Sequence, residues 1–133
     1  MSRWRLIFLG LLLLAVVGVG GCFLFPNHPP VASFTAEFGT DTQDPLVVVL
    51  DASGSTDPDG DDIVSYMWSF GHKEVDFIHP AAYSSRTVSV PSITIRCPFE
   101  GKYQVTLTVV DSRGAMSDPV TAQMQVPPST QGT

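Results

Sequence analysis

Apolar side chains recur at every second residue in several short segments of this chain, and this pattern limits its possible folds more than any other feature. In residues 102–110, Tyr103, Val105, Leu107 and Val109 alternate with polar side chains. Such alternation puts the apolar side chains of a strand on one face. Residues 45–50 are continuously apolar and predict a central strand. The other inward-facing sets that we expect are Ala32, Phe34, Ala36 and Phe38; Val64, Tyr66, Trp68 and Phe70; Ile93, Ile95 and Cys97; and Val120, Ala122, Met124 and Val126.

Turn-forming clusters separate these segments, and no segment of useful length has a helical period. The clusters are GTDTQD (39–44), SGSTDPDGDD (53–62), CPFEGK (97–102) and DSRGAMSD (111–118). Short strands at such spacing predict an all-β fold, a two-sheet antiparallel sandwich. Tyr103 stands at the start of a strand, where its hydroxyl can bond back to the backbone as in immunoglobulin-like folds. We expect Trp68 in the core and positive φ at Gly114, in a hairpin.

The N-terminus predicts export. MSRWR is basic, residues 6–25 carry no charge, and small residues precede Cys22. This arrangement resembles the lipobox of bacterial lipoproteins, in which signal peptidase cuts before the cysteine and the cysteine thiol receives a lipid. An uncleaved membrane-spanning anchor is the alternative, because the uncharged run is long enough to cross a bilayer. Either interpretation places the chain after Pro26 outside the cytoplasm, at the cell surface or in the periplasm.

This interpretation divides the chain into four parts. They are a signal peptide or membrane anchor (1–21), a tether (22–29), a sandwich (30–126) and a flexible tail (127–133). Without Arg3 and Arg5, 5 basic residues face 13 acidic ones, a net charge of −8. Such a surface disfavours nucleic-acid binding. Cys97 has no partner if Cys22 is lipidated, so we expect a buried thiol rather than a Cys22–Cys97 disulfide.

Four motifs, in order, resemble those of the PKD domain, a β-sandwich module first described in polycystic kidney disease proteins. They are PVASF (30–34), LDASGSTDPDG (50–60), YMWSFG (66–71) and GKYQVTLTVVD (101–111). The resemblance covers about residues 29–126. It implies an extracellular spacer, or a module that contacts protein or glycan in the cell envelope. Some members of the family bind calcium.

The chain departs from this family in one region. Relatives usually have Trp-Asp-Phe-Gly-Asp-Gly where this chain has Trp68-Ser69-Phe70-Gly71-His72-Lys73. Residues 72–91 are also longer than the usual connection. We expect an extra edge hairpin there, with Val88 and Val90 on one face. Because unusual surface loops often carry function, 72–91 is the candidate for a partner contact.

The aspartate-rich segment 51–62 permits two interpretations. Asp57, Asp59 and Asp61 alternate, but the glycine falls at the wrong place for a helix–loop–helix calcium loop, and Trp68 stands where that loop needs a glutamate. From the residues alone, a tight turn capped by Ser53, Ser55 and Asp57 is the simpler interpretation. The family resemblance keeps calcium open and implies ligands at Asp57, Asp59 and Asp111.

No group of side chains typical of an active site stands out, and we expect that the protein is not an enzyme. His72, Glu74, Asp76 and His79 could hold zinc, although a solvated edge strand is the more common outcome. Ser53, His28 and Asp57 could be written as a triad, but no nucleophile elbow surrounds Ser53. The sequence therefore predicts a membrane-tethered binding or scaffold module, with a calcium-stabilised spacer as the alternative.

Overall fold

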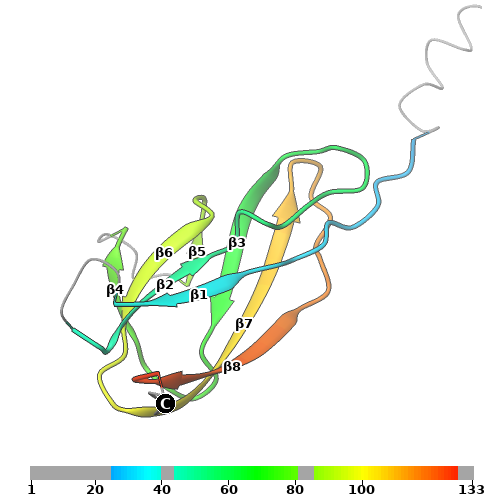
Figure 1. The fold of residues 1–133 in the computed structure, drawn as a ribbon. Helices are drawn as coiled ribbons and strands as arrows, with labels where there is room; N and C mark the ends of the chain where they lie inside the picture. The colour runs from blue at the N-terminus through cyan, green and yellow to red at the C-terminus, as the bar shows by residue number, and fades with distance from the viewer. Residues whose placement is uncertain (1–24, 40–43, 81–85, 129–133) are drawn as a thin grey trace, which may run out of the picture.

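The computed structural model describes residues 25–39, 44–80 and 86–128, and within them eight strands form two antiparallel sheets (Figure 1). One sheet has the order β1-β2-β6-β4 and the other β5-β3-β7-β8. The strands are β1 (Thr35–Phe38), β2 (Val47–Asp51), β3 (Ile63–Ser69), β4 (Asp76–His79), β5 (Thr87–Val88), β6 (Ser92–Arg96), β7 (Gly101–Asp111) and β8 (Val120–Val126). This confirms the predicted all-β sandwich.

The core lies between the two sheets and consists largely of the predicted alternating side chains. Tyr103, Val105, Leu107 and Val109 of β7 are at most 1% exposed. Trp68 of β3 packs edge-to-face against Phe34, with ring centroids 5.4 Å apart. The other predicted residues that the core buries are Ala32, Tyr66, Phe70, Ile93, Ile95, Cys97, Met124 and Val126. Period-two alternation therefore located most of the core.

Four residues that we expected to face inward are exposed. Val64 is 47% exposed because the pairing of β3 with β7 shifts register between Ile63 and Ser65, which turns the Val64 side chain outward. Ala36, Val120 and Ala122 are exposed as well, and they lie on β1 and β8, the edge strands of their sheets. The opposite sheet covers an edge strand only in part, which an alternating sequence does not reveal.

The predicted hairpin within 72–91 was wrong. β4 pairs with β6 in one sheet, and β5 pairs with β3 in the other, so the segment passes from sheet to sheet instead of folding back on itself (Figure 1). Val88 is 2% exposed, whereas Val90 is 39% exposed. Each strand of this segment pairs with a free edge of a different sheet, and no local pattern specifies that choice.

The predicted turn chemistry is confirmed. The Tyr103 hydroxyl donates a hydrogen bond to the Phe99 carbonyl oxygen over 2.7 Å, which forms the corner expected of an immunoglobulin-like fold. Gly114 has φ of 90° and Gly60 has φ of 78°, backbone conformations that side chains with a Cβ rarely adopt.

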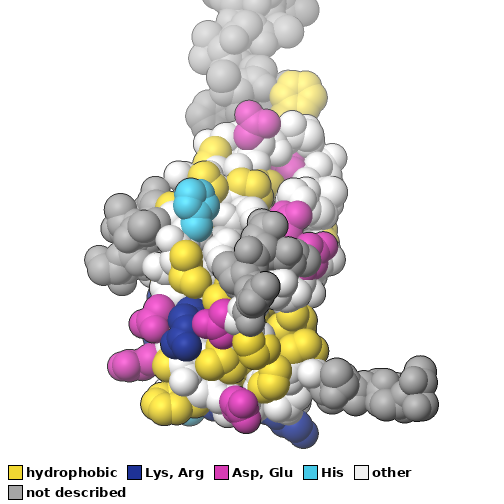
Figure 2. All heavy atoms as spheres, turned by 60° about the vertical axis from the view of Figure 1, so that its left-hand side comes forward, with side chains coloured by type: hydrophobic (Ala, Val, Ile, Leu, Met, Phe, Trp, Pro, Cys, Tyr) yellow, Lys and Arg dark blue, Asp and Glu magenta, His cyan; other side chains and the backbone are white. Residues whose placement is uncertain are grey.

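The predicted signal or anchor, including Cys22, lies outside the described residues, as does the end of the tail. In the part of the chain that the structure describes, we find no helix of sufficient length and apolarity to span a membrane. Figure 2 shows the side of the sandwich on which β4 lies, where acidic side chains are spread among apolar ones.

Candidate metal centre

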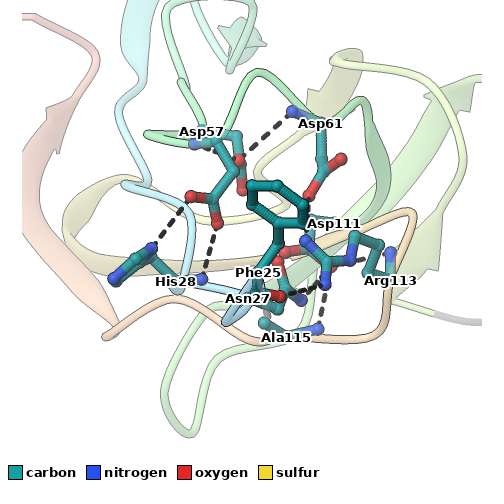
Figure 3. Close-up of polar contacts among 9 residues, drawn as sticks. Phe25, Asn27, His28, Asp57, Asp61, Asp111, Arg113 and Ala115 are labelled. Carbon is teal, nitrogen blue, oxygen red and sulfur yellow. Dashed lines mark hydrogen bonds and ion pairs between the residues drawn. The ribbon is translucent and has the colours of Figure 1, made fainter. Parts of the chain in front are cut away.

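Three segments that are distant in the sequence meet at one end of the sandwich. They are the N-terminal segment 25–31, the β2–β3 loop and the β7–β8 loop (Figures 1 and 3). Val31 and Thr56 exchange backbone hydrogen bonds of 2.7 and 3.0 Å, which fix the first segment to the second. The backbone N–H of Ser112 donates to the Asp62 carbonyl oxygen over 2.8 Å, which joins the two loops. Side chains from all three segments are thereby brought together.

The β2–β3 loop turns around the Asp57 side chain. Its Oδ1 accepts hydrogen bonds from the backbone N–H groups of Asp59, at 2.8 Å, and Asp61, at 3.2 Å. Gly60 donates its backbone N–H to the Asp57 carbonyl oxygen, and its positive φ allows the chain to close the turn. This confirms the capping role predicted for Asp57. The same turn leaves the second carboxylate oxygen of Asp57 free to face the site.

The Asp111 carboxylate lies at the centre of the second loop and is only 1% exposed. Its Oδ1 accepts hydrogen bonds from the backbone N–H groups of Arg113, at 2.9 Å, and Ala115, at 2.8 Å, and from Asn27 Nδ2, at 3.3 Å (Figure 3). Burial by itself would raise the pKa of Asp111, but the hydrogen bonds from Ala115, Asn27 and Arg113 together hold the pKa below its ordinary value. Asp111 is therefore a buried anion whose charge is supported on one oxygen only.

Four buried side-chain oxygens at this end of the sandwich have no hydrogen-bond donor. They are Asn27 Oδ1, Asp57 Oδ2, Asp61 Oδ2 and Asp111 Oδ2. In the described residues the fifth buried polar side-chain atom without a partner is Trp68 Nε1, which belongs to the core. Buried acceptors without donors are unusual in proteins, and each requires a physical explanation. Ordered water or a bound cation would satisfy acceptors of this kind.

The charges at this end do not balance. Asp57, Asp59, Asp61 and Asp111 contribute four negative charges, whereas Arg113, whose Nη1 lies 3.7 Å from Asp61 Oδ2, contributes one positive charge. The sum is −3 when His28 is neutral. Asp57 and Asp111 lie close enough for their side chains to interact. Carboxylates at such short range repel each other unless a proton or a cation lies between them.

Asp59 differs from the other three aspartates because His28 occupies both of its oxygens. The backbone N–H of His28 lies 2.6 Å from Asp59 Oδ2, and the His28 ring Nδ1 lies 2.8 Å from Oδ1. The side-chain and backbone hydrogen bonds from His28 lower the pKa of Asp59. Asp59 therefore holds the N-terminal segment as well as contributing charge to the cluster.

This donor set fits a calcium ion. Calcium takes six to eight oxygen ligands, largely from carboxylates and amide carbonyls. Carboxylate oxygens of Asp57, Asp59 and Asp61 lie within 4.8 Å of one another. Asp111 lies outside that group, but its side chain interacts with that of Asp57 and accepts a hydrogen bond from Asn27, so both residues adjoin the three aspartates. Several of these oxygens could coordinate a single ion at this end, and its positive charge would reduce the repulsion among the carboxylates.

The ligands expected from the sequence overlap in part with the residues that have buried oxygens without donors. Asp57 and Asp111 were expected, and both present a buried oxygen without a donor. Asp59, also expected, lies in the group of three aspartates and contacts His28 as well. Asn27 and Asp61 also present a buried oxygen without a donor, and neither was among the expected ligands. Asp61 could have been found from its place in the Asp57-Asp59-Asp61 alternation, whereas no local signal marks Asn27, which a connection distant in sequence brings to the site.

The other groupings considered from sequence are not assembled. His28 contacts Asp59 and has no hydrogen bond to Ser53 among those of the described residues, so the triad does not form. Over the described residues, Asp57, Asp59 and Asp61 are the one group of His, Cys, Asp or Glu side chains close enough to hold a metal. The zinc set of 72–79 is therefore not brought together.

The two antiparallel sheets and the Tyr103 corner define an immunoglobulin-like β-sandwich, with its loops gathered at the two ends. The family model described as "PKD domain" matches residues 27–126, and the chain therefore belongs to the PKD domain family. The curated proteins contain no significant match to this chain.

Solved structures agree with this assignment. The PKD1 domain of Vibrio anguillarum Epp is 29% identical, with a TM-score of 0.55, over 78% of this chain and 100% of that one. The PKD1 domain of the Vibrio cholerae metalloprotease PrtV is 29% identical, with a TM-score of 0.52, over 74% and 98%. A structure described under carbohydrate-binding modules of the β-sandwich superfamily is 33% identical, with a TM-score of 0.55, over 81% of this chain. The match covers only 38% of that last chain.

Proposed function

We propose that this chain is a membrane-tethered, extracytoplasmic PKD module that presents its sandwich to a protein partner in the cell envelope. The observation that carries the proposal is the fixed path of the N-terminal segment. The Phe25 carbonyl oxygen accepts a hydrogen bond of 2.9 Å from Arg113, and Asn27 and His28 contact Asp111 and Asp59. An anchor before residue 25 would thus be attached to a defined end of the domain, with the other end directed away from the membrane.

The anchor in this proposal is either a lipid on Cys22 or an uncleaved helix, and one experiment separates the two. The cells are labelled with a palmitate analogue. We expect label on the wild type and on Cys97→Ala, and none on Cys22→Ala. Loss of label together with continued membrane association would favour the helix. A wild-type chain found entirely in the soluble fraction would overturn membrane tethering.

The exposed side chains favour a protein partner over a glycan. Sugar-binding sites commonly use exposed aromatic rings with a polar edge. In the described part of the chain, Trp68, Tyr66 and Tyr103 are all at least 94% buried, and the exposed rings of Phe25 and Phe99 have no polar edge. Crosslinking mass spectrometry on intact membranes tests this part of the proposal. Repeated crosslinks from 72–91 to one envelope protein would support it, and scattered crosslinks would favour a spacer.

Calcium binding is the second function that a specific observation supports. The oxygens without donors on Asn27, Asp57, Asp61 and Asp111 would hold the ion, and Asp59 would complete the charge around it. The ion would supply the positive charge that the cluster lacks. Because Asn27 belongs to the N-terminal segment, occupancy would also strengthen the attachment of the tether to the sandwich. The module would then be a calcium-stabilised spacer whether or not it has a partner.

A further inference from the structure

The four edge strands of the sandwich are not equally protected against pairing with another chain. β5 has two residues, and β1 has four, one of them Glu37. β4 carries Asp76 and His79, and its pairing with β6 shifts register between Phe77 and His79. Figure 2 shows the acidic side chains on the side where β4 lies. Short length, charge and irregular register are the usual devices that prevent edge-to-edge association.

β8 has none of these devices. Its seven residues, VTAQMQV, contain no charge and no proline. They pair with β7 in unbroken register, from Gly101 opposite Val126 to Leu107 opposite Val120. β8 ends its sheet, and its outer edge has no strand partner in the described residues (Figure 1). An uncharged, regular edge of this length is a template for another strand.

The β8 sequence is complementary to a second copy of itself when the two strands pair antiparallel. If a second copy pairs antiparallel about Gln123, Val120 lies opposite Val126 and Ala122 opposite Met124. Thr121 then lies opposite Gln125, and Gln123 opposite its own copy. Each apolar side chain of β8, the exposed Val120 and Ala122 included, meets another apolar one, and each polar side chain meets a polar one. Such a contact is isologous, so that it closes as a two-fold dimer rather than growing into a filament.

Prolines at both ends of β8 limit the register of this pairing, and a groove adjoins the strand. Pro119 and Pro127 flank β8, and because proline has no N–H to donate, they end the pairing at both sides. A groove of about 220 Å³ lies beside the start of β8, lined by Pro29, Pro30, Val31, Ala32, Asp118 and Val120. In the two-fold arrangement the end of the second copy's β8, followed by Pro127, approaches this mostly apolar groove. The groove and the strand edge therefore form one continuous surface.

We propose that the β8 edge, with the adjoining groove, is a homodimerisation surface whose occupant is β8 of a second copy of this chain. The two four-stranded sheets join into one eight-stranded sheet. The antiparallel pairing directs the two N-terminal ends in opposite directions. Copies with anchors therefore pair across two facing membranes, a consequence that rests on the tether proposed above.

The first test uses residues 25–128 in solution. This part encloses the whole core, and the PKD1 domain of Vibrio anguillarum Epp was solved as a chain of comparable extent. Sedimentation equilibrium from micromolar to millimolar protein should show a reversible monomer–dimer transition. Gln123→Lys places two like charges opposite each other and should weaken the dimer by about tenfold or more. Gln104→Lys, on the neighbouring strand β7 opposite Gln123, is the matched control and should dimerise like the wild type.

A disulfide tests the register directly. In the proposed pair the two Gln123 side chains face each other at a Cβ separation of about 4.5–5.5 Å, and the short end of this range lies within the reach of a disulfide. Gln123→Cys should therefore give a covalent dimer on mild oxidation. Gln125→Cys should not, since its neighbour in the second copy is Thr121. Equal crosslinking of both variants, or a wild type that stays monomeric at millimolar concentration, overturns the proposal.

Vesicles separate this inference from the proposed tether. The full chain is inserted into phosphatidylcholine vesicles, and clustering is followed by light scattering. Clustering that Gln123→Lys abolishes and Gln104→Lys leaves intact supports pairing across facing membranes. A domain that dimerises in solution while its membrane-bound vesicles stay dispersed overturns that consequence and leaves the dimer standing. Failure of the chain to remain with vesicles contradicts the tether alone.

Discussion

Calcium should stabilise the wild-type domain, and Asp111→Asn should remove that effect. Asp111 is 1% exposed, and its Oδ2 is one of the four buried oxygens without a donor. Asparagine can keep an acceptor at the Oδ1 position for Arg113, Ala115 and Asn27 while placing an N–H₂ group where a cation would bind. The substitution is nearly isosteric, so it removes a ligand and a charge without removing volume.

The size of the calcium effect follows from linkage. Extracellular calcium sites have dissociation constants of about 10⁻⁴ to 10⁻³ M. At about 10 mM calcium such a site stabilises the folded state by roughly 1.4–2.7 kcal/mol. For a domain of about 100 residues, this stabilisation corresponds to a rise in Tm of about 6–20 °C.

The assay is thermal unfolding of residues 25–128 by circular dichroism, with chelator and then with calcium. Asp76→Asn is the matched control, because Asp76 is an exposed aspartate of β4, outside the acidic cluster. It should retain the full rise in Tm. No rise for the wild type would refute the metal centre, and a full rise in Asp111→Asn would refute the ligand set deduced from the buried oxygens.

Three further outcomes are expected. Tyr103→Phe removes the 2.7 Å hydrogen bond to the Phe99 carbonyl oxygen, at a cost of about 1 kcal/mol, and should lower Tm by about 4–8 °C in calorimetry; an unchanged Tm would contradict the corner's role. Because the folded-state pKa values of Asp59 and Asp111 lie below their ordinary values, they stabilise the fold at neutral pH. That stability should be lost as pH falls below about 4, and a Tm that does not fall between pH 5 and 2 would argue against these contacts. Burial raises the pKa of the Cys97 thiol to about 11, so iodoacetamide at pH 8 should modify it only after denaturation, and rapid labelling of the native domain would show that the core opens.

The fold could be predicted from the sequence because period-two alternation is a local pattern with a single geometric meaning. The alternation of β7, from Tyr103 to Val109, describes its burial almost completely. The pattern failed at Val64, where a register shift with β7 reverses the side chain. It also failed at Ala36, Val120 and Ala122, since the exposure of an edge strand depends on how far the opposite sheet extends. Alternation therefore gives the face of a side chain and not the depth of its burial.

The candidate site was predicted only in part, for a related reason. The turn around Asp57 is a local structure made by hydrogen bonds within a few residues, and the residue types of the loop predict it. The Asn27 amide reaches Asp111 across 84 residues of sequence, and no spacing rule predicts that contact. The link between His28 and Asp59 is of the same kind. Sequence proximity can suggest an acidic loop, but it does not show which oxygens are left without donors.

The sequence alone determined the sandwich and its corner tyrosine, because both depend on residue types at short, fixed separations. Tertiary structure decided the rest. It divided 72–91 between two sheets and left β8 as an uncharged edge. It also brought the N-terminal segment to two loops at one end of the domain. These outcomes depend on the packing of strands distant in sequence, where the free energy comes from contacts that no single segment contains.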